Sequence, residues 1–383
     1  MVFISLRQLT IMLENLKIGI LGGGQLGAMI MRHAIDFGLS VSIMDNDAHA
    51  PCSRYTSSFF CGDPASFEAV LEFGKDLDVI TIEKEAVNIN ALRQLEKQGV
   101  RIFPTPDTIE IIQDKFTQKQ FLLSHNIPVA PGEVIQGKND LYQYESKLPL
   151  CLKKRRDGYD GYGVMVLKTR EDIAAAFDAP CVVEELVDIK HEISVIVARN
   201  EHGAVACYDP VMMVFSEEKF ILDYQIAPAQ LDEEILKEAT NLAKGIADAI
   251  QLVGILAVEM FVTKDHKILV NELAPRPHNS GHHTIEASTT SQYEQLLRAV
   301  LGLPLGATAL HLPSLMMNVL ENASLNTDRQ GKLQRLLDIP GAHLHWYGKE
   351  GKRPGRKVGH VTITGNTIEN VIAKAESIRK ILN

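Results

Sequence analysis

Two strand-like segments in the last third of the chain each carry an acidic residue among apolar neighbours. One contains Val258-Glu259-Met260-Phe261, and the other contains Leu269-Val270-Asn271-Glu272. The polar residues 264–267 between them predict a short turn, so the two strands should be antiparallel neighbours that bring Glu259 and Glu272 together. Two carboxylates and the amide oxygen of Asn271 would make an oxygen site suited to Mg²⁺, which in such sites commonly bridges nucleotide phosphates. The alternative is a pair of solvated carboxylates at a sheet edge.

A polar loop follows the second carboxylate directly. Residues 274–283 combine Arg276, His278, Asn279 and Ser280 with two prolines that stiffen the backbone. Ordered polar loops beside the end of a sheet are where binding and catalytic sites are commonly built. The loop therefore favours a functional site over solvated carboxylates.

Length and composition limit the classes of protein that this chain can belong to. Its 383 residues exceed one hydrophobic core and indicate two or three domains. With 45% hydrophobic and 23% charged residues it has the composition of a soluble globular protein, and its net charge of −9 argues against a nucleic-acid partner. Its five scattered cysteines lack metal-ligand spacing and fit a reduced cytoplasmic compartment. No apolar run reaches the roughly 18 residues of a membrane span, and we expect residues 1–11 to lie outside the fold.

The first hundred residues alternate between strand and helix patterns. Strands are predicted at residues 17–21, 41–45, 78–83 and 100–103, an order typical of a parallel sheet with crossover helices. The loop Gly22-Gly23-Gly24-Gln25-Leu26-Gly27 would place backbone N–H groups and a helix N-terminus at the carboxyl edge of this sheet, where a phosphate is favourable. Asp45 ends the second strand, as the ribose-binding acid of dinucleotide domains does, so an NAD-dependent oxidoreductase stays open as an alternative.

The middle of the chain places cations and acids on neighbouring strands. An amphipathic helix is predicted from Gln113 to Asn126, and Lys153 lies on a later strand before a glycine-rich loop. Lysine beside such a loop suits phosphate neutralisation under a mobile cover, although a solvated basic turn has a similar pattern. The predicted strand 181–187 carries Glu184 and could face an adenine and its ribose, and Glu192 lies on the next strand.

A basic cluster stands out near the C-terminus of this acidic chain. Lysines and arginines between Lys349 and Lys357 follow a predicted strand at 343–347 and precede a strand and the final helix. A cation cluster held between regular elements favours an anion site over a solvated face.

The order of these motifs resembles that of the ATP-grasp enzymes, and four blocks are similar to the 5-(carboxyamino)imidazole ribonucleotide synthase family of purine biosynthesis. The first two are the glycine loop 22–27 and Arg155-Arg156 with Gly158-Tyr159-Asp160-Gly161. The third is Asn271-Glu272-Leu273-Ala274-Pro275-Arg276-Pro277-His278-Asn279-Ser280-Gly281-His282, and the fourth is Tyr347-Gly348-Lys349 with Arg353-Pro354-Gly355-Arg356-Lys357-Val358-Gly359-His360. The resemblance covers residues 16 to 365. It implies an α/β and α+β fold with a Rossmann-like parallel-sheet domain at 16–112, a central ATP-grasp lid domain at 113–183, and a C-terminal ATP-grasp domain with a terminal strand–helix subdomain at 184–383.

The function that the resemblance implies is that of an ATP-dependent carbon–nitrogen ligase. It would carboxylate 5-aminoimidazole ribonucleotide to its N5-carboxyamino form with ATP and bicarbonate, through carboxyphosphate, releasing ADP and phosphate. Joining two anions requires Mg²⁺ and preplaced cations rather than a protein nucleophile. The family also implies a homodimer, while the composition favours the cytoplasm and argues against a nucleic-acid or membrane partner. Another ATP-grasp ligase, such as a formate-using glycinamide ribonucleotide enzyme, is an alternative that the C-terminal block disfavours.

The resemblance also assigns residues by motif position. The catalytic residues would be Tyr159, Glu83 and Arg276. The ATP-binding residues would be Lys115, Lys153, Gly158, Tyr159, Asp160, Gly161, Tyr162, Gly163, Val164, Glu184, Glu185, Leu186, Val187, Glu192, Asn271 and Glu272. The substrate-binding residues would be Gly24, Gln25, Leu26, Asp160, His278, Asn279, Lys349 and Arg356, and the metal ligands would be Glu259 and Glu272.

The sequence departs from the family pattern in three places. Tyr162 stands where a lysine or arginine is usual, Asp157 stands where glycine is usual, and residues 214–217 lack the common Asn-x-His. These differences concern the lid and nucleotide contacts and leave the reaction class unchanged.

Overall fold

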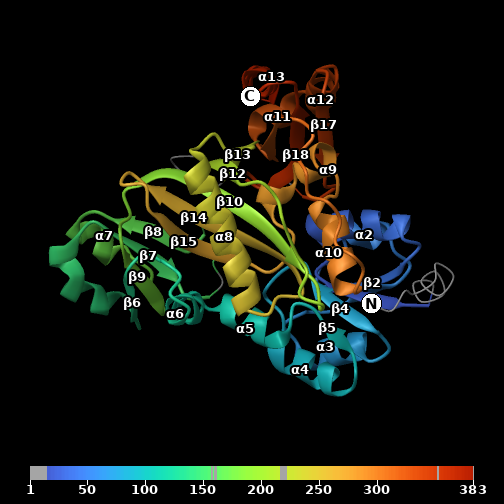
Figure 1. The fold of residues 1–383 in the computed structure, drawn as a ribbon, viewed down its shortest axis with the longest axis horizontal. Coiled ribbons are helices and arrows are strands. Elements are labelled where there is room, and N and C mark those ends of the chain that lie inside the picture. The colour runs from blue at the N-terminus through green and yellow to red at the C-terminus, as the bar shows by residue number, and fades with distance from the viewer. Residues whose placement is uncertain (1–14, 157, 159–161, 216–221, 352, 383) are drawn as a thin grey trace.

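Three β-sheets organise the chain in the computed structural model, which describes residues 15–156, 158, 162–215, 222–351 and 353–382 (Figure 1). The expectation for residues 1–11 therefore lies outside the described residues. Within the described parts, no helix has both the length and the apolar character needed to cross a membrane.

The N-terminal sheet is entirely parallel, as the alternating pattern predicted. Its strands follow the order β3-β2-β1-β4-β5, with bounds β1 Lys17–Leu21, β2 Ser40–Asp45, β3 Phe59–Cys61, β4 Val79–Ile82 and β5 Arg101–Ile102. Helix α2 (Gln25–Asp36) covers one face, while α3 (Phe67–Gly74) and α4 (Ile89–Lys97) cover the other. Sequence reasoning missed β3, because three residues are too few to show a strand period.

Two short helices connect this sheet to the rest of the chain. The single helix predicted over 113–126 is wrong at its start: α5 (Pro106–Gln113) ends before Asp114, and α6 (Lys115–Ser124) begins after it. Asp114 has an extended backbone and its carboxylate accepts hydrogen bonds from the backbone N–H groups of Phe116 and Thr117. An aspartate cap of this kind ends one helix and starts the next, because it satisfies N–H groups that have no partner within the helix.

The second sheet has four strands and is entirely antiparallel. Its order is β6-β9-β7-β8, with bounds β6 Gly132–Ile135, β7 Leu150–Lys154, β8 Val164–Leu167 and β9 Cys181–Glu185. The 3₁₀ segment η2 (Lys138–Lys147) and α7 (Arg170–Ala174) pack against it. The strand predicted at 181–187 ends at Glu185, so Leu186 and Val187 lie beyond it.

The largest sheet has nine strands and runs from the centre of the molecule to its C-terminal end. Its strands are β10 Ile189–Arg199, β11 Val205–Cys207, β12 Val211–Phe215, β13 Leu222–Ala227, β14 Gly254–Thr263, β15 Ile268–Ala274, β16 Ser314–Leu320, β17 Ala342–Trp346 and β18 Lys357–Thr364. Helix α8 (Glu233–Ala249) lies across the central strands and buries Ile235, Ala239 and Ile246, which were predicted to share one face (Figure 1). Burial of each isoleucine stabilises the fold by about 1.5–3 kcal/mol.

Helices pack against the large sheet at its C-terminal strands and where it meets the N-terminal domain. Three helices pack beside β16–β18: α11 (Ala323–Thr327), α12 (Arg329–Leu337) and α13 (Ile368–Leu382). Helix α10 (Gln292–Val300) lies beside α2, and Tyr293, Leu296 and Leu297 share one core with α2 and β1 (Figure 1). This shared core joins the N-terminal sheet to the large sheet.

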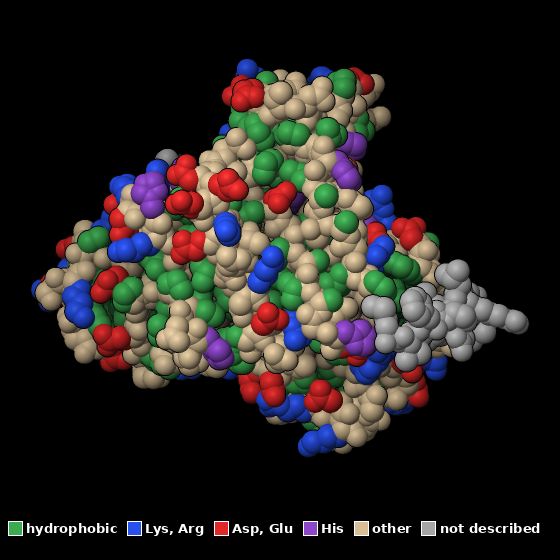
Figure 2. All heavy atoms as spheres, viewed as in Figure 1, with side chains coloured by type: hydrophobic (Ala, Val, Ile, Leu, Met, Phe, Trp, Pro, Cys, Tyr) green, Lys and Arg blue, Asp and Glu red, His purple; other side chains and the backbone are tan. Residues whose placement is uncertain are grey.

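Charged side chains of both signs are interspersed on the face of the molecule drawn in Figure 2. That face has no broad basic area, in keeping with the acidic net charge of −9.

Candidate functional site

The two predicted strand carboxylates are direct neighbours. Glu259 on β14 is the register partner of Glu272 on β15, as the sequence predicted. The next pair joins Met260 to Val270, so Asn271 is an extra residue in the ladder. Such a bulge redirects side chains. Asn271 Oδ1 accepts a hydrogen bond from Lys153 Nζ at 2.8 Å, while Glu272 pairs with a different lysine.

A cleft of about 640 Å³ opens over these carboxylates. Residues predicted for the site that line it are Gln25, Leu26, Glu83, Lys115, Gly158, Glu259, Glu272, Arg276, His278 and Asn279. They come from the N-terminal domain, from α6 and the loop between β7 and β8, and from β14, β15 and the loop that follows β15. Tertiary structure therefore brings the glycine loop, the start of α6 and the polar loop 274–283 to one place.

The carboxylates in this cleft are electrostatically unequal. Burial, and after it the nearby Glu272 and Glu192 carboxylates, raise the pKa of Glu259 to about 8. Burial also raises the pKa of Glu192 to about 7. Burial alone would raise the pKa of Glu272, but Lys115, with Nζ 2.9 Å from Glu272 Oε2, and Lys153 contribute to lowering it below its ordinary value. When all three carboxylates are ionised, they therefore carry more negative charge than the neighbouring lysines neutralise.

Glu184 lies between two buried lysines beside the cleft. Its Oε2 is 2.7 Å from Lys153 Nζ on β7, and its Oε1 is 2.7 Å from Lys119 Nζ on α6. The two ammonium groups outweigh burial and lower the pKa of Glu184. Lys119 was missed by sequence reasoning, although it follows Lys115 by four residues and so lies on the same helix face.

The root of the glycine-rich loop is fixed to α6 through Asp114. Arg155 Nη2 donates to Asp114 Oδ2 at 2.8 Å, Arg156 Nε donates to the same oxygen at 3.2 Å, and the Lys115 N–H donates to the Arg155 carbonyl. Among the predicted loop residues, Gly158, Tyr162, Gly163 and Val164 are described, whereas Asp157 and Tyr159, Asp160 and Gly161 lie outside the described residues. Tyr162 is 66% exposed.

The glycine loop holds carboxylates of its own chain. Glu83 accepts hydrogen bonds from the backbone N–H groups of Gly24 at 2.9 Å and Gly27 at 2.5 Å, where α2 begins. Asp45 accepts from the Gly23 N–H at 2.7 Å. The prediction of a phosphate at this helix N-terminus is therefore corrected: the Glu83 carboxylate takes that position, and Asp45 points inward rather than towards a ribose.

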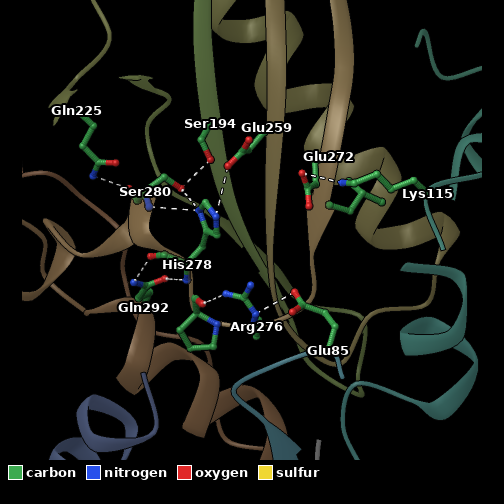
Figure 3. Close-up of polar contacts among 12 residues, drawn as sticks. Glu85, Lys115, Ser194, Gln225, Glu259, Glu272, Arg276, His278, Ser280 and Gln292 are labelled. Atoms are coloured by element: carbon green, nitrogen blue, oxygen red, sulfur yellow. Dashed lines mark hydrogen bonds and ion pairs between the residues drawn. The ribbon is translucent and has the colours of Figure 1, made fainter. Parts of the chain in front are cut away.

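The loop that follows β15 is held on both sides of the cleft (Figure 3). Arg276 Nε lies 2.9 Å from Glu85 Oε1, and His278 Nε2 lies 3.3 Å from Glu259 Oε1. The backbone N–H of His278 donates to Gln292 Oε1, and Gln292 Nε2 donates back to the His278 carbonyl. Sequence reasoning missed Glu85 and Gln292, since neither stands in a chemical motif.

Three histidines stack behind this loop. The His360 ring centroid lies 4.4 Å from that of His282 and 4.3 Å from that of His345. Tyr347 Oη and His360 Nδ1 are 2.7 Å apart, and His345 Nε2 lies 2.7 Å from a Glu286 carboxylate oxygen. Burial lowers the pKa of His282 and of His360, so these rings are neutral and pack the wall of the cleft.

The C-terminal basic cluster reaches the cleft with only part of its residues. Tyr347 and Lys357 line it, whereas Lys349 and Arg356 lie outside the lining. Arg356 Nη1 donates to the Glu350 carbonyl at 2.6 Å, and the Glu350 carboxylate lies 2.5 Å from Arg54 Nη2 of the N-terminal domain. These contacts connect Glu350 and Arg356 to the N-terminal domain.

Comparison with known proteins matches the chain almost from end to end. Residues 15–113 match the ribonucleotide synthetase preATP-grasp domain, residues 120–293 the ATP-grasp domain, and residues 314–374 the phosphoribosylaminoimidazole carboxylase C-terminal domain. The N5-carboxyaminoimidazole ribonucleotide synthase of Bacillus subtilis is 38% identical to this chain, with 90% of each chain covered. The chain belongs to the N5-carboxyaminoimidazole ribonucleotide synthase family.

Solved structures agree with this family assignment. The carboxyaminoimidazole ribonucleotide synthase of Aspergillus clavatus in complex with ADP and 5-aminoimidazole ribonucleotide superposes with a TM-score of 0.88 at 32% identity, covering 96% of this chain and 98% of that one. The synthase family's ATP-grasp fold, with an N-terminal parallel-sheet domain followed by antiparallel sheets, is thus the fold of this chain. The chain spans about two thirds of the chloroplastic phosphoribosylaminoimidazole carboxylase of Vigna aconitifolia, with which it shares 36% identity.

Proposed function

We propose that this protein is an ATP-dependent carbon–nitrogen ligase that carboxylates 5-aminoimidazole ribonucleotide with bicarbonate, releasing ADP and phosphate in de novo purine biosynthesis. The observation that carries the proposal is the convergence of Glu259, Glu272, Lys115 and the loop 274–283 on one cleft, in a chain that matches synthases over nine tenths of its length. Family membership argues against an NAD-dependent oxidoreductase, and the inward-pointing Asp45 argues against it independently.

ATP would bind where the small antiparallel sheet meets the large one. Lys115 and Lys153 supply the cations for its phosphates, since each lies within 3 Å of a carboxylate or amide oxygen near the strand pair. We place the nucleotide beside Gly158, Tyr162, Gly163, Val164, the segment Glu184, Glu185, Leu186 and Val187, and Glu192, Asn271 and Glu272. Lys119 would hold Glu184 in place from behind.

Magnesium fits the charge balance of the cleft. The pKa of Glu259 is raised to about 8 because it is buried beside two other carboxylates, so the cluster needs a further cation before all three ionise. Among the described residues no group of three or more His, Cys, Asp or Glu could hold a metal ion, so water and nucleotide oxygens would have to complete the coordination of Mg²⁺. Glu259 and Glu272 would hold the ion, and when bound it would neutralise charge on the transferring phosphoryl group.

Bicarbonate and the aminoimidazole would meet on the other side of the carboxylates. Arg276, His278 and Asn279 line this part of the cleft, together with Glu83, Gln25 and Leu26. Arg276 would orient the bicarbonate, with its guanidinium already fixed by Glu85. Lys349 and Arg356 would hold the ribose phosphate. Tyr159 and Asp160, which the motif assigns to catalysis and substrate binding, and the neighbouring Gly161 lie outside the described residues.

Phosphate release from ATP tests this proposal. With MgATP and bicarbonate present, we expect release to accelerate strongly when 5-aminoimidazole ribonucleotide is added and to give the N5-carboxylated product. Formate and glycinamide ribonucleotide are the control substrates for another ATP-grasp ligase. Turnover with that pair and none with bicarbonate would contradict the proposal. MgATP should raise the melting temperature and NAD should leave it unchanged.

The proposal includes a cytoplasmic homodimer. All five cysteines are free thiols, which fits a reducing compartment. We place the contact between copies on the N-terminal helices, where Ile35 of α2 is 68% exposed. Sedimentation of the protein and of an Ile35→Glu variant tests the dimer: the variant should sediment as a monomer, and a monomeric wild-type protein would contradict it.

A further inference from the structure

Two buried serines stand behind His278 in a continuous line. Ser194 on β10 is the register partner of Glu259 on β14, so the two side chains emerge on the same face of the sheet. Ser194 Oγ lies 2.8 Å from Ser280 Oγ, and Ser280 Oγ lies 2.9 Å from His278 Nδ1 (Figure 3). Ser194 is 1% exposed and Ser280 is fully buried.

The direction of these hydrogen bonds follows from one backbone group. The Ser280 N–H donates to His278 Nδ1 at 3.2 Å, so Nδ1 must be the acceptor and carries no proton. The Ser280 hydroxyl can then donate to the same nitrogen, and Ser194 donates to Ser280. The ring proton is consequently on Nε2, the nitrogen that faces Glu259 Oε1 at 3.3 Å.

Two glutamines fix the backbone on either side of this contact. Gln292 binds both backbone polar groups of His278, and Gln225 Nε2 donates to the Ser280 carbonyl at 2.6 Å. With the opposite tautomer, the Ser280 N–H would point at a protonated Nδ1. Two donors that face each other are repulsive in a buried site.

We propose that Ser280 and Ser194 are positioning residues that hold His278 in the tautomer with its proton on Nε2. In this state His278 donates to Glu259 and fixes the orientation of that carboxylate at the edge of the cleft. Groups that orient a ligand from behind commonly affect activity by 10- to 100-fold. The effect on turnover rests on the proposed function, whereas the tautomer itself is independent of it.

Nitrogen NMR of protein labelled with ¹⁵N-histidine tests the tautomer without any substrate. The His278 signals are assigned by their loss in His278→Asn. We expect an unprotonated Nδ1 and a protonated Nε2 in the wild-type protein. In Ser280→Ala both nitrogens should move towards intermediate shifts, and in Ser194→Ala they should move less but in the same direction. A protonated Nδ1 in the wild-type protein, or unchanged shifts in both variants, would overturn the proposal.

Steady-state kinetics test the consequence for the reaction. Ser280→Ala and Ser194→Ala should lower kcat roughly tenfold and weaken the apparent affinity for Mg²⁺. The matched control is Ser314→Ala, since Ser314 is a fully buried serine of the same sheet whose hydroxyl has no partner among the described residues. A native kcat in both Ser280→Ala and Ser194→Ala would overturn the positioning role. If the wild-type protein does not use bicarbonate, the proposed function fails while the NMR result still decides the tautomer.

Discussion

Lys115 Nζ lies 2.9 Å from Glu272 Oε2, so a cation at the first position of α6 neutralises one of two carboxylates that face each other across β14 and β15. The other carboxylate, Glu259, has its Oε1 3.3 Å from His278 Nε2 instead. This difference separates the pair into an ionised member and a member with a raised pKa. The two residues should therefore respond differently to substitution and to pH.

Glu272→Gln should slow the reaction about a hundredfold. The change keeps the side-chain shape but removes a charge beside the proposed metal, so transition-state charge is less stabilised by roughly 3 kcal/mol. Initial rates measured across Mg²⁺ concentrations check this. A native rate with the native Mg²⁺ dependence would place the metal elsewhere. Glu286→Gln, at the His345 contact behind the cleft, is a control for loss of a buried carboxylate.

The stability of the ligand-free protein should fall as pH rises from about 5 to about 8. The pKa of Glu259 is about 8 in the folded protein against an ordinary value of 4.5, so between these values the folded state keeps a proton that the unfolded state has released. Stability therefore decreases with pH in this window and levels off above it. Thermal melting of the wild-type protein and of Glu259→Gln at several pH values checks this. Parallel curves for the two proteins would contradict the shifted pKa, and Mg²⁺ should restore stability most at pH 8.

Arg356→Ala should raise KM for 5-aminoimidazole ribonucleotide by about ten- to a hundredfold and leave KM for ATP nearly unchanged. The lost contact to the ribose phosphate is charge-assisted and contributes roughly 1.5–3 kcal/mol. Because Arg356 also binds the Glu350 carbonyl, some of the loss would come from a displaced loop. Arg353→Ala, an exposed residue of the same loop, is the control. An equal increase in KM for ATP would assign the cluster to the nucleotide.

Asp114→Ala should destabilise the protein by about 2–4 kcal/mol. The change removes a helix cap of about 1 kcal/mol and also the charge-assisted hydrogen bonds from Arg155 and Arg156. Ser66→Ala removes only the cap of α3 and should lower the melting temperature less. Asp114→Ala should additionally raise KM for ATP, since the root of the glycine-rich loop loses its anchor. Equal effects of the two substitutions would show that the arginine contacts contribute nothing.

The sequence alone was sufficient for elements whose pattern is local. The alternation of short apolar strands with helices predicted the parallel sheet, and the polar turn 264–267 predicted the pairing of Glu259 with Glu272. Both follow from periodicity and turn chemistry within a short stretch of chain. The motif blocks similarly identified the family, which the comparisons confirmed.

Only the tertiary structure decided which partner each polar group binds. The glycine loop looked like a phosphate site, but Glu83, 56 residues from Gly27, fills it with the chain's own carboxylate. The direction of the line from Ser194 through Ser280 to His278 likewise depends on contacts across 86 residues of sequence. Hydrogen bonds and ion pairs act over about 3 Å in space and leave no period in the sequence, so side chains from distant segments find their partners only when the sheets have packed.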